Sequence, residues 1–455
     1  MSHLKRVSSV IGVALGVGIS IFVGSGLVRS LVLAQNGPLP DANRSTPLQV
    51  YPQIKTDRAE ALYKCDEKAE FKIAFTGKDV DDPDWEVLYE LSKDGYGKIE
   101  SGKVPRTGGT VGATLTEPGF LRCRLILTWK KGRVTEEFVA VGFEPHKLQP
   151  SLPVPDDFEA FWDGQKKALR EKAAKPKFTS LKSPDAAIEC WGVEVALPVG
   201  RPLTGYLARP KDTAAKSLPA VLVIDGSYFR DAQLKEAVTQ AKQGRVALHM
   251  NPHGGPLGRP QAVYDKCVLP GGDLHTWPQD GINDREKAYY RPMVLRVVQG
   301  LDVLAADSAW DGKRLGVLGA SMGGGLAIIA GGLDHRVSFV GSAIPSLCDC
   351  SGYTSKRQPG WNIVPYDRTF GPDQAILKTM RYFDAVNFAT RVKAETVVSC
   401  GLHDINCPPT SIHVMYNALG AKKAMIRDPE MGHDHPDTMA KAFEAAMIKA
   451  FAQVK

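Results

Sequence analysis

The chain has 455 residues, of which 43% are hydrophobic and 24% charged, and its formal net charge is +7. This composition is typical of a globular protein, and the length accommodates two domains. The basic residues do not gather in runs, which indicates solvated lysine and arginine and argues against nucleic-acid binding. No internal repeat or low-complexity segment is present.

The N-terminus has the pattern of an export signal. Lys5 and Arg6 precede an apolar run over residues 7–28, and small residues lead to Ala34. This pattern predicts a secretory signal peptide with cleavage after Ala34. The run is also long enough to span a bilayer, so an uncleaved membrane anchor stays open. In either case we expect a periplasmic or extracellular protein, with residues 35–48 as a linker.

Residues 49–145 contain short alternating segments, such as 70–75 and 124–129, separated by Gly, Asp and Pro clusters. This pattern predicts a small all-β immunoglobulin-like sandwich. Cys65 and Cys123 both lie in strand-like segments, and a bridge across the sandwich is left open. The other six cysteines lack the repeated spacing of a zinc site and are expected to be free core thiols.

Residues 146–455 alternate strands and helices, which predicts a mostly parallel sheet flanked by helices. A helix is expected to open at Asp156–Trp162, after the proline-rich stretch 145–155. Apolar segments 219–224 and 246–250 are expected early strands, and helical spacing of apolar residues marks 285–306.

Ser321 lies in the run Gly319-Ala320-Ser321-Met322-Gly323, between a strand-like segment, 314–318, and a helix-like segment, 324–330. A serine between small residues at a strand-to-helix turn is the nucleophile elbow of α/β-hydrolases. The turn strains the serine backbone, and the small neighbours avoid the adjacent strand and helix. The context therefore predicts Ser321 as a nucleophile, with the Met322 amide as an oxyanion donor.

In α/β-hydrolases an acid and then a histidine follow the serine along the chain. Asp404 follows a buried-looking strand, 396–400, and His433 follows a short strand, 424–427. The histidine would take the serine proton, and the carboxylate would orient the imidazole. His435 and His403 compete with His433 as the base, and Asp404 could instead cap a turn.

Several separate motifs resemble one family. They are Asp284-Arg285 with Tyr289-Tyr290 and Arg296, Ser-x-Gly-Gly-Gly at Ser321, Pro345–Asp349, Tyr382–Asp384 with Asn387–Ala389, Gly401–Asp404, Cys407–Pro409 and Tyr416-Asn417. Over residues 155–455 the chain resembles the acetyl xylan esterase and cephalosporin C deacetylase family of α/β-hydrolases. The resemblance implies the α/β-hydrolase fold, Asp404 as the acid and His433, after Gly432, as the base. An added sandwich domain also occurs in some exported members.

Two positions depart from the family pattern. Met322 stands where glutamine is usual, but only its backbone amide is needed. The second oxyanion donor of the family follows a His-Gly pair, and here that place reads Asp225-Gly226-Ser227-Tyr228. The resemblance therefore implies the Ser227 amide as second donor, while a carboxylate at Asp225 would oppose oxyanion charge unless it is paired or turned away.

Two further residues are expected near the substrate. Tyr228 could line the acyl pocket or fill the core. His253 lies in a segment that resembles a family loop near the active site, although a turn histidine with a structural hydrogen bond fits as well.

The resemblance implies a secreted serine carboxylesterase that removes acetyl groups from carbohydrate esters, such as acetylated xylan, without a metal or organic cofactor. An exported serine peptidase, a general esterase and a degenerate carbohydrate-binding protein are the alternatives. The expected partner is an acetylated carbohydrate or another small acyl ester. Relatives form ring-like oligomers, so assembly into homo-oligomers stays open, as do the natural sugar and the acyl-chain preference.

Overall fold

The computed structural model describes residues 49–129, 134–172, 174–361, 366–367 and 371–454. The predicted leader, 1–34, and linker, 35–48, lie outside these residues. No helix in the described ranges is long and apolar enough to cross a membrane.

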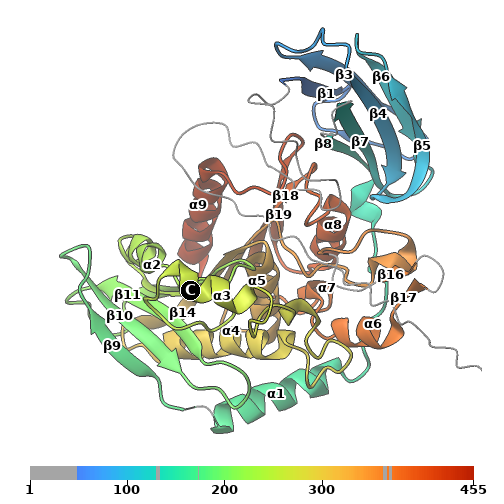
Figure 1. Ribbon diagram of the computed structural model, residues 1–455. Coiled ribbons are helices and arrows are strands. Elements are labelled where there is room, and N and C mark those ends of the chain that lie inside the picture. The colour runs from blue at the N-terminus through green and yellow to red at the C-terminus, as the bar shows by residue number, and fades with distance from the viewer. Residues whose placement is uncertain (1–48, 130–133, 173, 362–365, 368–370, 455) are drawn as a thin grey trace, which may run out of the picture.

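Residues 49–143, which we call the β-domain, form two sheets (Figure 1). The three-stranded sheet is antiparallel and has the order β1 (Tyr51–Thr56), β3 (Lys68–Thr76) and β6 (Gly109–Thr114). The five-stranded sheet has the order β2 (Leu62–Tyr63), β8 (Val134–Phe143), β7 (Gly119–Trp129), β4 (Trp85–Lys93) and β5 (Tyr96–Val104). Only β2 and β8 pair in parallel within it.

The core of the β-domain forms because successive side chains of a strand point to opposite faces of its sheet. Along β7, buried and half-buried residues alternate from Leu121 to Trp129, so that one face of the strand is apolar. Phe75 on the three-stranded sheet meets Trp85 on the five-stranded sheet, with ring centroids 5.1 Å apart. The two sheets therefore share an apolar interior.

Cys65 and Cys123 do not form the bridge that the sequence left open, and all eight cysteines have free thiols. Cys123 is opposite Val139 in the middle of the β7–β8 pair. Cys65 follows β2, which pairs with the far end of β8 at Gly142 and Phe143. The two thiols thus lie at different levels of the sheet, and a disulfide needs closely apposed Cβ atoms.

The larger part of the chain is built on a nine-stranded sheet. Its order is β19 (Lys423–Asp428), β18 (Glu395–Gly401), β15 (Phe339–Ala343), β14 (Trp310–Ala320), β12 (Leu218–Ile224), β13 (Val246–Met250), β11 (Leu203–Pro210), β10 (Ile188–Val195) and β9 (Lys177–Leu181). Strands from β19 to β13 are parallel, and β11, β10 and β9 add an antiparallel edge. This mostly parallel arrangement agrees with the sequence prediction.

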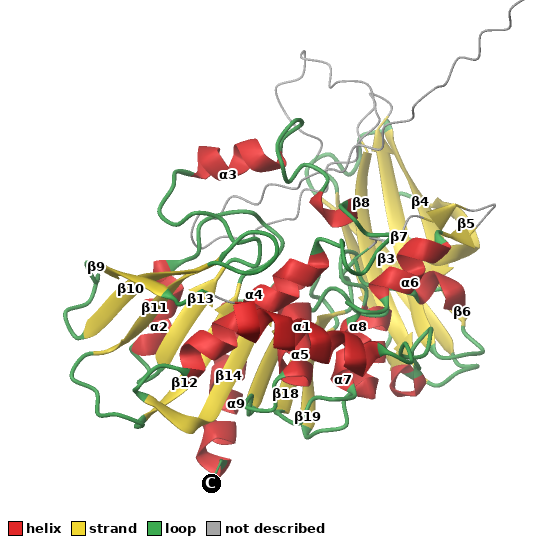
Figure 2. Cartoon of the chain, turned by 90° about the horizontal axis from the view of Figure 1, so that it is seen from below, coloured by secondary structure: helices red, strands yellow, loops and turns green. Residues whose placement is uncertain are grey.

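Helices cover both faces of this sheet. Figure 2 shows α1, α4 and α5 on the near face, and α2 and α9 cover the other face through apolar contacts. The α-helices are α1 (Phe158–Lys172), α2 (Leu234–Ala241), α3 (Gln261–Val268), α4 (Tyr290–Ala305), α5 (Met322–Leu333), α6 (Gln374–Met380), α7 (Ala385–Ala389), α8 (Pro409–Ala418) and α9 (Asp437–Gln453). Short 3-10 helices η1 (Pro145–Lys147), η2 (Trp277–Gln279) and η3 (Gly352–Ser355) and a small hairpin, β16 (Tyr366–Asp367) and β17 (Gly371–Pro372), complete the described elements.

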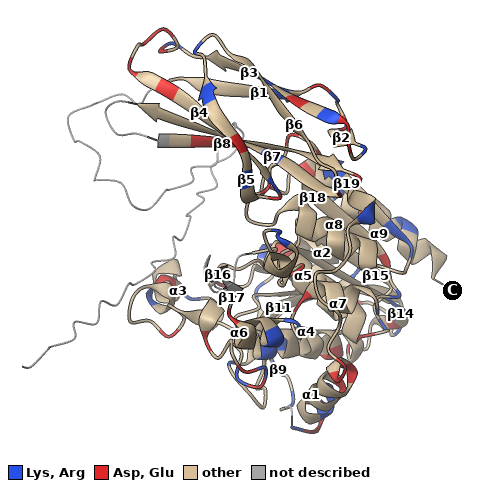
Figure 3. Cartoon of the chain, turned by 90° about the vertical axis from the view of Figure 1, so that its right-hand side faces the viewer, with Lys and Arg blue, Asp and Glu red and all other residues tan. Residues whose placement is uncertain are grey.

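Buried strands read as continuous apolar runs because helices lie on both sides. All five residues of β13 are buried, as are residues 220–222 of β12. In the view of Figure 3, Lys and Arg are interspersed with Asp and Glu. Loops follow the carboxyl ends of the parallel strands, and ligands bind at these ends in open α/β sheets.

Candidate active site

Ser321 occupies a sharp turn between β14 and α5. Its backbone has φ 56° and ψ −120°, a conformation that an L-residue adopts only under constraint. Its amide donates to the Ala343 carbonyl at 2.9 Å, and its carbonyl accepts from the Ser346 amide at 3.0 Å. The turn is thus pinned to the segment after β15, and the strand-turn-helix context predicted from the sequence is present.

Gly319 and Gly323 let the backbone pass through this turn. A Cβ on Gly319 would lie 2.2 Å from the Gly323 carbonyl oxygen. A Cβ on Gly323 would lie 2.3 Å from the Ile224 carbonyl oxygen. Both distances are far below van der Waals contact, so any side chain here would displace main chain and with it Ser321.

His433 joins Ser321 to Asp404. The Ser321 hydroxyl lies 3.0 Å from His433 Nε2, and His433 Nδ1 lies 2.8 Å from Asp404 Oδ2. Because an ionised carboxylate only accepts, Nδ1 carries the proton, and Nε2 is left to accept from the serine hydroxyl. The structure thus brings together the three residues that the sequence singled out, each beyond the carboxyl end of a parallel strand.

Asp404 is held rigidly by its own loop. Its exposed fraction is 2%, and its Oδ1 accepts from the amides of Asn406 at 2.9 Å and Cys407 at 2.8 Å. One carboxylate oxygen therefore binds the loop, and the other is left for His433. The two amide donors were not foreseen, because the sequence does not show how the loop turns back on the aspartate.

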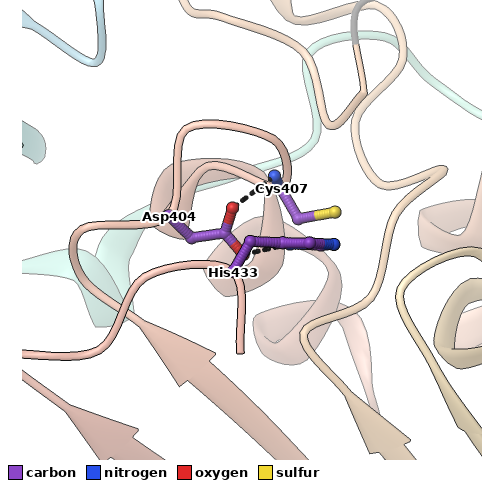
Figure 4. A group of neighbouring side chains, drawn as sticks. All are labelled: Asp404, Cys407 and His433. Atoms are coloured by element: carbon purple, nitrogen blue, oxygen red, sulfur yellow. Dashed lines mark hydrogen bonds and ion pairs between the residues drawn. The ribbon is translucent and has the colours of Figure 1, made fainter. Parts of the chain in front are cut away.

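Figure 4 shows Asp404, Cys407 and His433 side by side. Their potential ligand atoms lie within 4.8 Å of one another, close enough to contact one metal ion. Both ring nitrogens of His433 and both carboxylate oxygens of Asp404 are, however, already in hydrogen bonds. Burial also raises the pKa of the Cys407 thiol well above its usual value, so the thiolate a metal needs is disfavoured. The arrangement favours hydrogen bonding over metal ligation.

The predicted oxyanion donors flank Ser321. Met322 is the first residue of α5, so its amide has no acceptor within the helix. The amide also lies at the positive end of the helix dipole. Ser227 lies in the loop after β12, the strand beside β14. Among the described residues, the Ser227 amide donates to no backbone acceptor. These two amides are the ones that the sequence predicted as oxyanion donors.

The Asp225 carboxylate is paired with Arg230, so its negative charge is neutralised near the predicted oxyanion donors. Arg230 binds it through two hydrogen bonds, from Nε to Oδ2 at 2.7 Å and from Nη2 to Oδ1 at 2.6 Å. Asn251 Nδ2 adds a bond to Oδ2 at 3.2 Å, and the Gly226 amide one to Oδ1 at 3.0 Å. The carboxylate is thereby saturated with donors. Arg230 and Asn251 were missed from the sequence, since no motif links them to Asp225.

His253 is buried, which fits the expected alternative of a turn histidine with a structural hydrogen bond. The residue has an exposed fraction of 0%. Its Nε2 lies 3.0 Å from the Ser227 carbonyl oxygen, and its Nδ1 lies 3.1 Å from the Tyr289 hydroxyl. Since a carbonyl only accepts, Nε2 donates and the Tyr289 hydroxyl donates to Nδ1. Burial lowers the pKa of His253 to about 3, so the ring stays neutral and holds the loop that carries Ser227.

Tyr228 lies on the surface of the same loop. Half of the residue is exposed, at 50%, and its carbonyl accepts from Asn251 Nδ2 at 2.7 Å. The core-filling alternative for this tyrosine is therefore wrong. Tyr228 is thus an exposed aromatic residue next to Ser227 in the chain.

Two solved structures with a similar architecture are acetyl xylan esterases. The acetyl xylan esterase from Paenibacillus sp. R4 is 26% identical, has a TM-score of 0.58, and the match covers 67% of this chain and 98% of that one. Acetyl xylan esterase 1 from Thermoanaerobacterium sp. JW/SL YS485 shares the fold, at 22% identity and a TM-score of 0.58, with 68% and 98% covered. The protein is a carboxylic ester hydrolase of the α/β-hydrolase fold.

The family follows from the sequence comparisons. The model described as "Acetyl xylan esterase (AXE1)" matches residues 143–452. The "Acetyl esterase Axe7A" of Xylanibacter ruminicola is 30% identical over an alignment of 388 residues, and the match covers 83% of this chain and 85% of that protein. The chain therefore belongs to the acetyl xylan esterase family, as its motifs led us to expect.

Arg230→Ala tests whether neutralising the charge of Asp225 is needed for activity, since Asp225 lies in the same loop as Ser227. The substitution leaves a buried carboxylate without its counter-ion, two residues before Ser227. We expect kcat/KM for a chromogenic acetyl ester to fall about 10- to 100-fold, less than the loss of a whole oxyanion donor. The double variant Arg230→Ala/Asp225→Asn removes the charge and should recover most of the loss. Unchanged activity of Arg230→Ala would show that Asp225 does not influence the site.

Proposed function

We propose that this protein is an exported serine carboxylesterase that removes acetyl groups from carbohydrate esters, such as acetylated xylan or xylo-oligosaccharides, through an acyl-enzyme. The observation that carries the proposal is the continuous hydrogen-bond chain from Ser321 through His433 to the buried Asp404. A serine hydroxyl is a weak nucleophile until a base takes its proton, and this chain supplies that base.

In the proposed reaction Ser321 Oγ attacks the ester carbonyl carbon while His433 Nε2 takes the hydroxyl proton. Asp404 keeps the imidazole in the required tautomer and stabilises its positive charge. His433 then gives the proton to the leaving sugar oxygen, and an acetyl-serine remains. Water, deprotonated by the same imidazole, attacks the acetyl-serine and releases acetate.

The negative oxygen of each tetrahedral intermediate is stabilised by the amides of Met322 and Ser227. Such donors act most strongly when they are fixed before the reaction, because they then need no reorganisation. Three features support fixed donors here: the helix start at Met322, the His253–Tyr289 pair behind Ser227 and the saturated Asp225. These features also argue against a degenerate site, which would have no use for them.

The substrate class rests on the family and on its named members. The curated relative is called an acetyl esterase, and the structural relatives are called acetyl xylan esterases. Exposed Tyr228 is suited to contact the acyl group or the sugar ring at the rim of the site. A peptidase is not supported, since the additional part of the chain is a β-domain of two sheets, whereas a propeller needs several four-stranded blades.

We also propose that the β-domain is immunoglobulin-like. Its two sheets, with the orders β1-β3-β6 and β2-β8-β7-β4-β5, support this assignment, because immunoglobulin sandwiches divide their strands in a similar way. The basic and apolar N-terminus supports export to the periplasm or the medium, with or without retention as a membrane anchor.

Release of acetate tests the proposed function. The purified protein lacking residues 1–34 should release acetate from acetylated xylan and acetylated xylo-oligosaccharides, and hydrolyse a chromogenic acetyl ester faster than its longer-chain homologues. Preference for longer acyl chains would identify a general esterase instead. No turnover of any of these esters would contradict the proposal.

Single substitutions test the assigned roles. Ser321→Ala and His433→Ala should each lower kcat about 10⁴- to 10⁶-fold, since the members of such a unit act together. His435→Ala is the matched control: its ring packs 5.5 Å from Phe443, and its Nδ1 has no partner among the described residues. Steady-state kinetics on the acetyl ester should show His435→Ala close to the wild type. If His435→Ala were inactive and His433→Ala active, the base would be misassigned.

A further inference from the structure

The β-domain lies against the loop that carries Asp404. We call residues 402–410, which follow β18 and include the first two residues of α8, the acid loop. Figures 1 and 3 show β7 of the β-domain close to α8, and the two elements are in contact. Residues from both sides enclose a cavity of only about 10 Å³. This volume is too small for more than one water molecule. The two surfaces are therefore closely packed.

The first contact is a buried hydrogen bond across this interface. The Thr410 hydroxyl donates to Asp94 Oδ1, which also accepts from the Phe120 amide at 2.6 Å. Asp94 and Thr410 have exposed fractions of 4% and 1%. A polar pair buried this deeply is costly to separate, because each group would lose its partner without gaining water.

The second contact is apolar. Phe120, with an exposed fraction of 1%, packs its ring 5.0 Å from the ring of His413 on α8. His413 Nδ1 donates to the Pro409 carbonyl at 2.8 Å, so the ring is fixed to the end of the acid loop. Phe120 therefore packs against His413, and His413 is hydrogen-bonded to the acid loop.

The third contact reaches the residue after Asp404. Arg122 of β7 donates from Nη1 to Gln358 Oε1 at 3.1 Å, and Gln358 Nε2 donates to the Ile405 carbonyl at 3.4 Å. The Ile405 carbonyl belongs to the peptide whose amide is that of Asn406, and this amide binds Asp404 Oδ1. The β-domain is therefore linked by side chains to the peptide that orients the carboxylate.

We propose that the β-domain positions the catalytic acid: through Asp94, Phe120 and Arg122 it holds the acid loop so that Asp404 stays in register with His433. Thr410 and Gln358 are positioning residues in this scheme and contact neither substrate nor reacting atoms. The inference rests on the proposed function, because a positioned acid matters only if the Ser321–His433–Asp404 chain is catalytic. The β-domain would thereby affect the reaction rate through the position of Asp404.

The physical basis is the narrow tolerance of proton transfer. Asp404 meets His433 at 2.8 Å, and a misplacement of about 1 Å in a catalytic array costs roughly 10²-fold in rate. A loop attached only at its ends samples such displacements. Contacts from a rigid sheet suppress them, which is the usual function of supporting residues around a site.

Thr410→Val and Gln358→Met test the proposal, since each removes one contact while nearly preserving side-chain size. The rate constant for organophosphonate labelling of Ser321, and kcat and KM for a chromogenic acetyl ester, are measured together with the melting temperature. We expect labelling and kcat to fall about 10-fold in Thr410→Val, with KM within about twofold, since the acid moves but the pocket does not.

Two further variants are matched controls. Asp94→Asn retains Oδ1, places its amide where Oδ2 has no partner, and suits the positive φ of 54°. Burial raises the pKa of Asp94 to about 6, so an uncharged group is tolerated there, and Asp94→Asn should retain kcat.

Asn417→Ala removes bonds from Asn417 Nδ2 to the carbonyls of Pro145 and Leu148, both 2.9 Å, at the other end of α8. It should lower the melting temperature and leave kcat unchanged.

The outcomes separate this inference from the proposed function. Wild-type labelling and kcat in both Thr410→Val and Gln358→Met would overturn the positioning role, as would an equal loss of kcat in Asn417→Ala. A wild-type protein that labels at Ser321 but does not hydrolyse acetyl esters would contradict the substrate proposal alone, because the labelling rates still report on Asp404. A wild-type protein that does not label would overturn both.

Discussion

The turn at Ser321 is the constraint on which the rest of the site depends. A serine with φ 56° can persist only if the surrounding main chain holds it there, and two glycines make that close approach feasible. This geometry sets the start of α5 and hence the Met322 amide. It also sets the place that His433 must reach, so the loops after β18 and β19 are arranged around a point fixed by backbone packing.

Around that point, buried polar groups are satisfied by specific partners. Asp225 is neutralised by Arg230, His253 binds the Ser227 carbonyl, and Asp404 accepts from two amides of its own loop. In a buried site an unpartnered polar group is costly, so such a network has few alternative arrangements. The same physics that stabilises the fold here keeps donors fixed where charge would develop.

The sequence predicted the features encoded by short segments. The elbow at Ser321, the strands ahead of Asp404 and His433, and the mostly parallel sheet depend on local turn chemistry and on apolar periodicity. Apart from the contacts of Ser321, His433 and Asp404, which follow from the order of a known motif, it could not predict contacts between distant segments. Asp94 and Thr410 are 316 positions apart, and nothing in either segment refers to the other. For the same reason the burial of His253, the Asp225–Arg230 pair and the separation of Cys65 from Cys123 became apparent only in three dimensions.

Whether Ser321 is a nucleophile activated by His433 can be tested by mass spectrometry of the protein after treatment with a fluorophosphonate. We expect one adduct per chain, on the peptide containing Ser321, formed rapidly by the native protein and not formed by protein unfolded in urea before treatment. A native, folded protein without an adduct, or with an adduct on another serine, would contradict it.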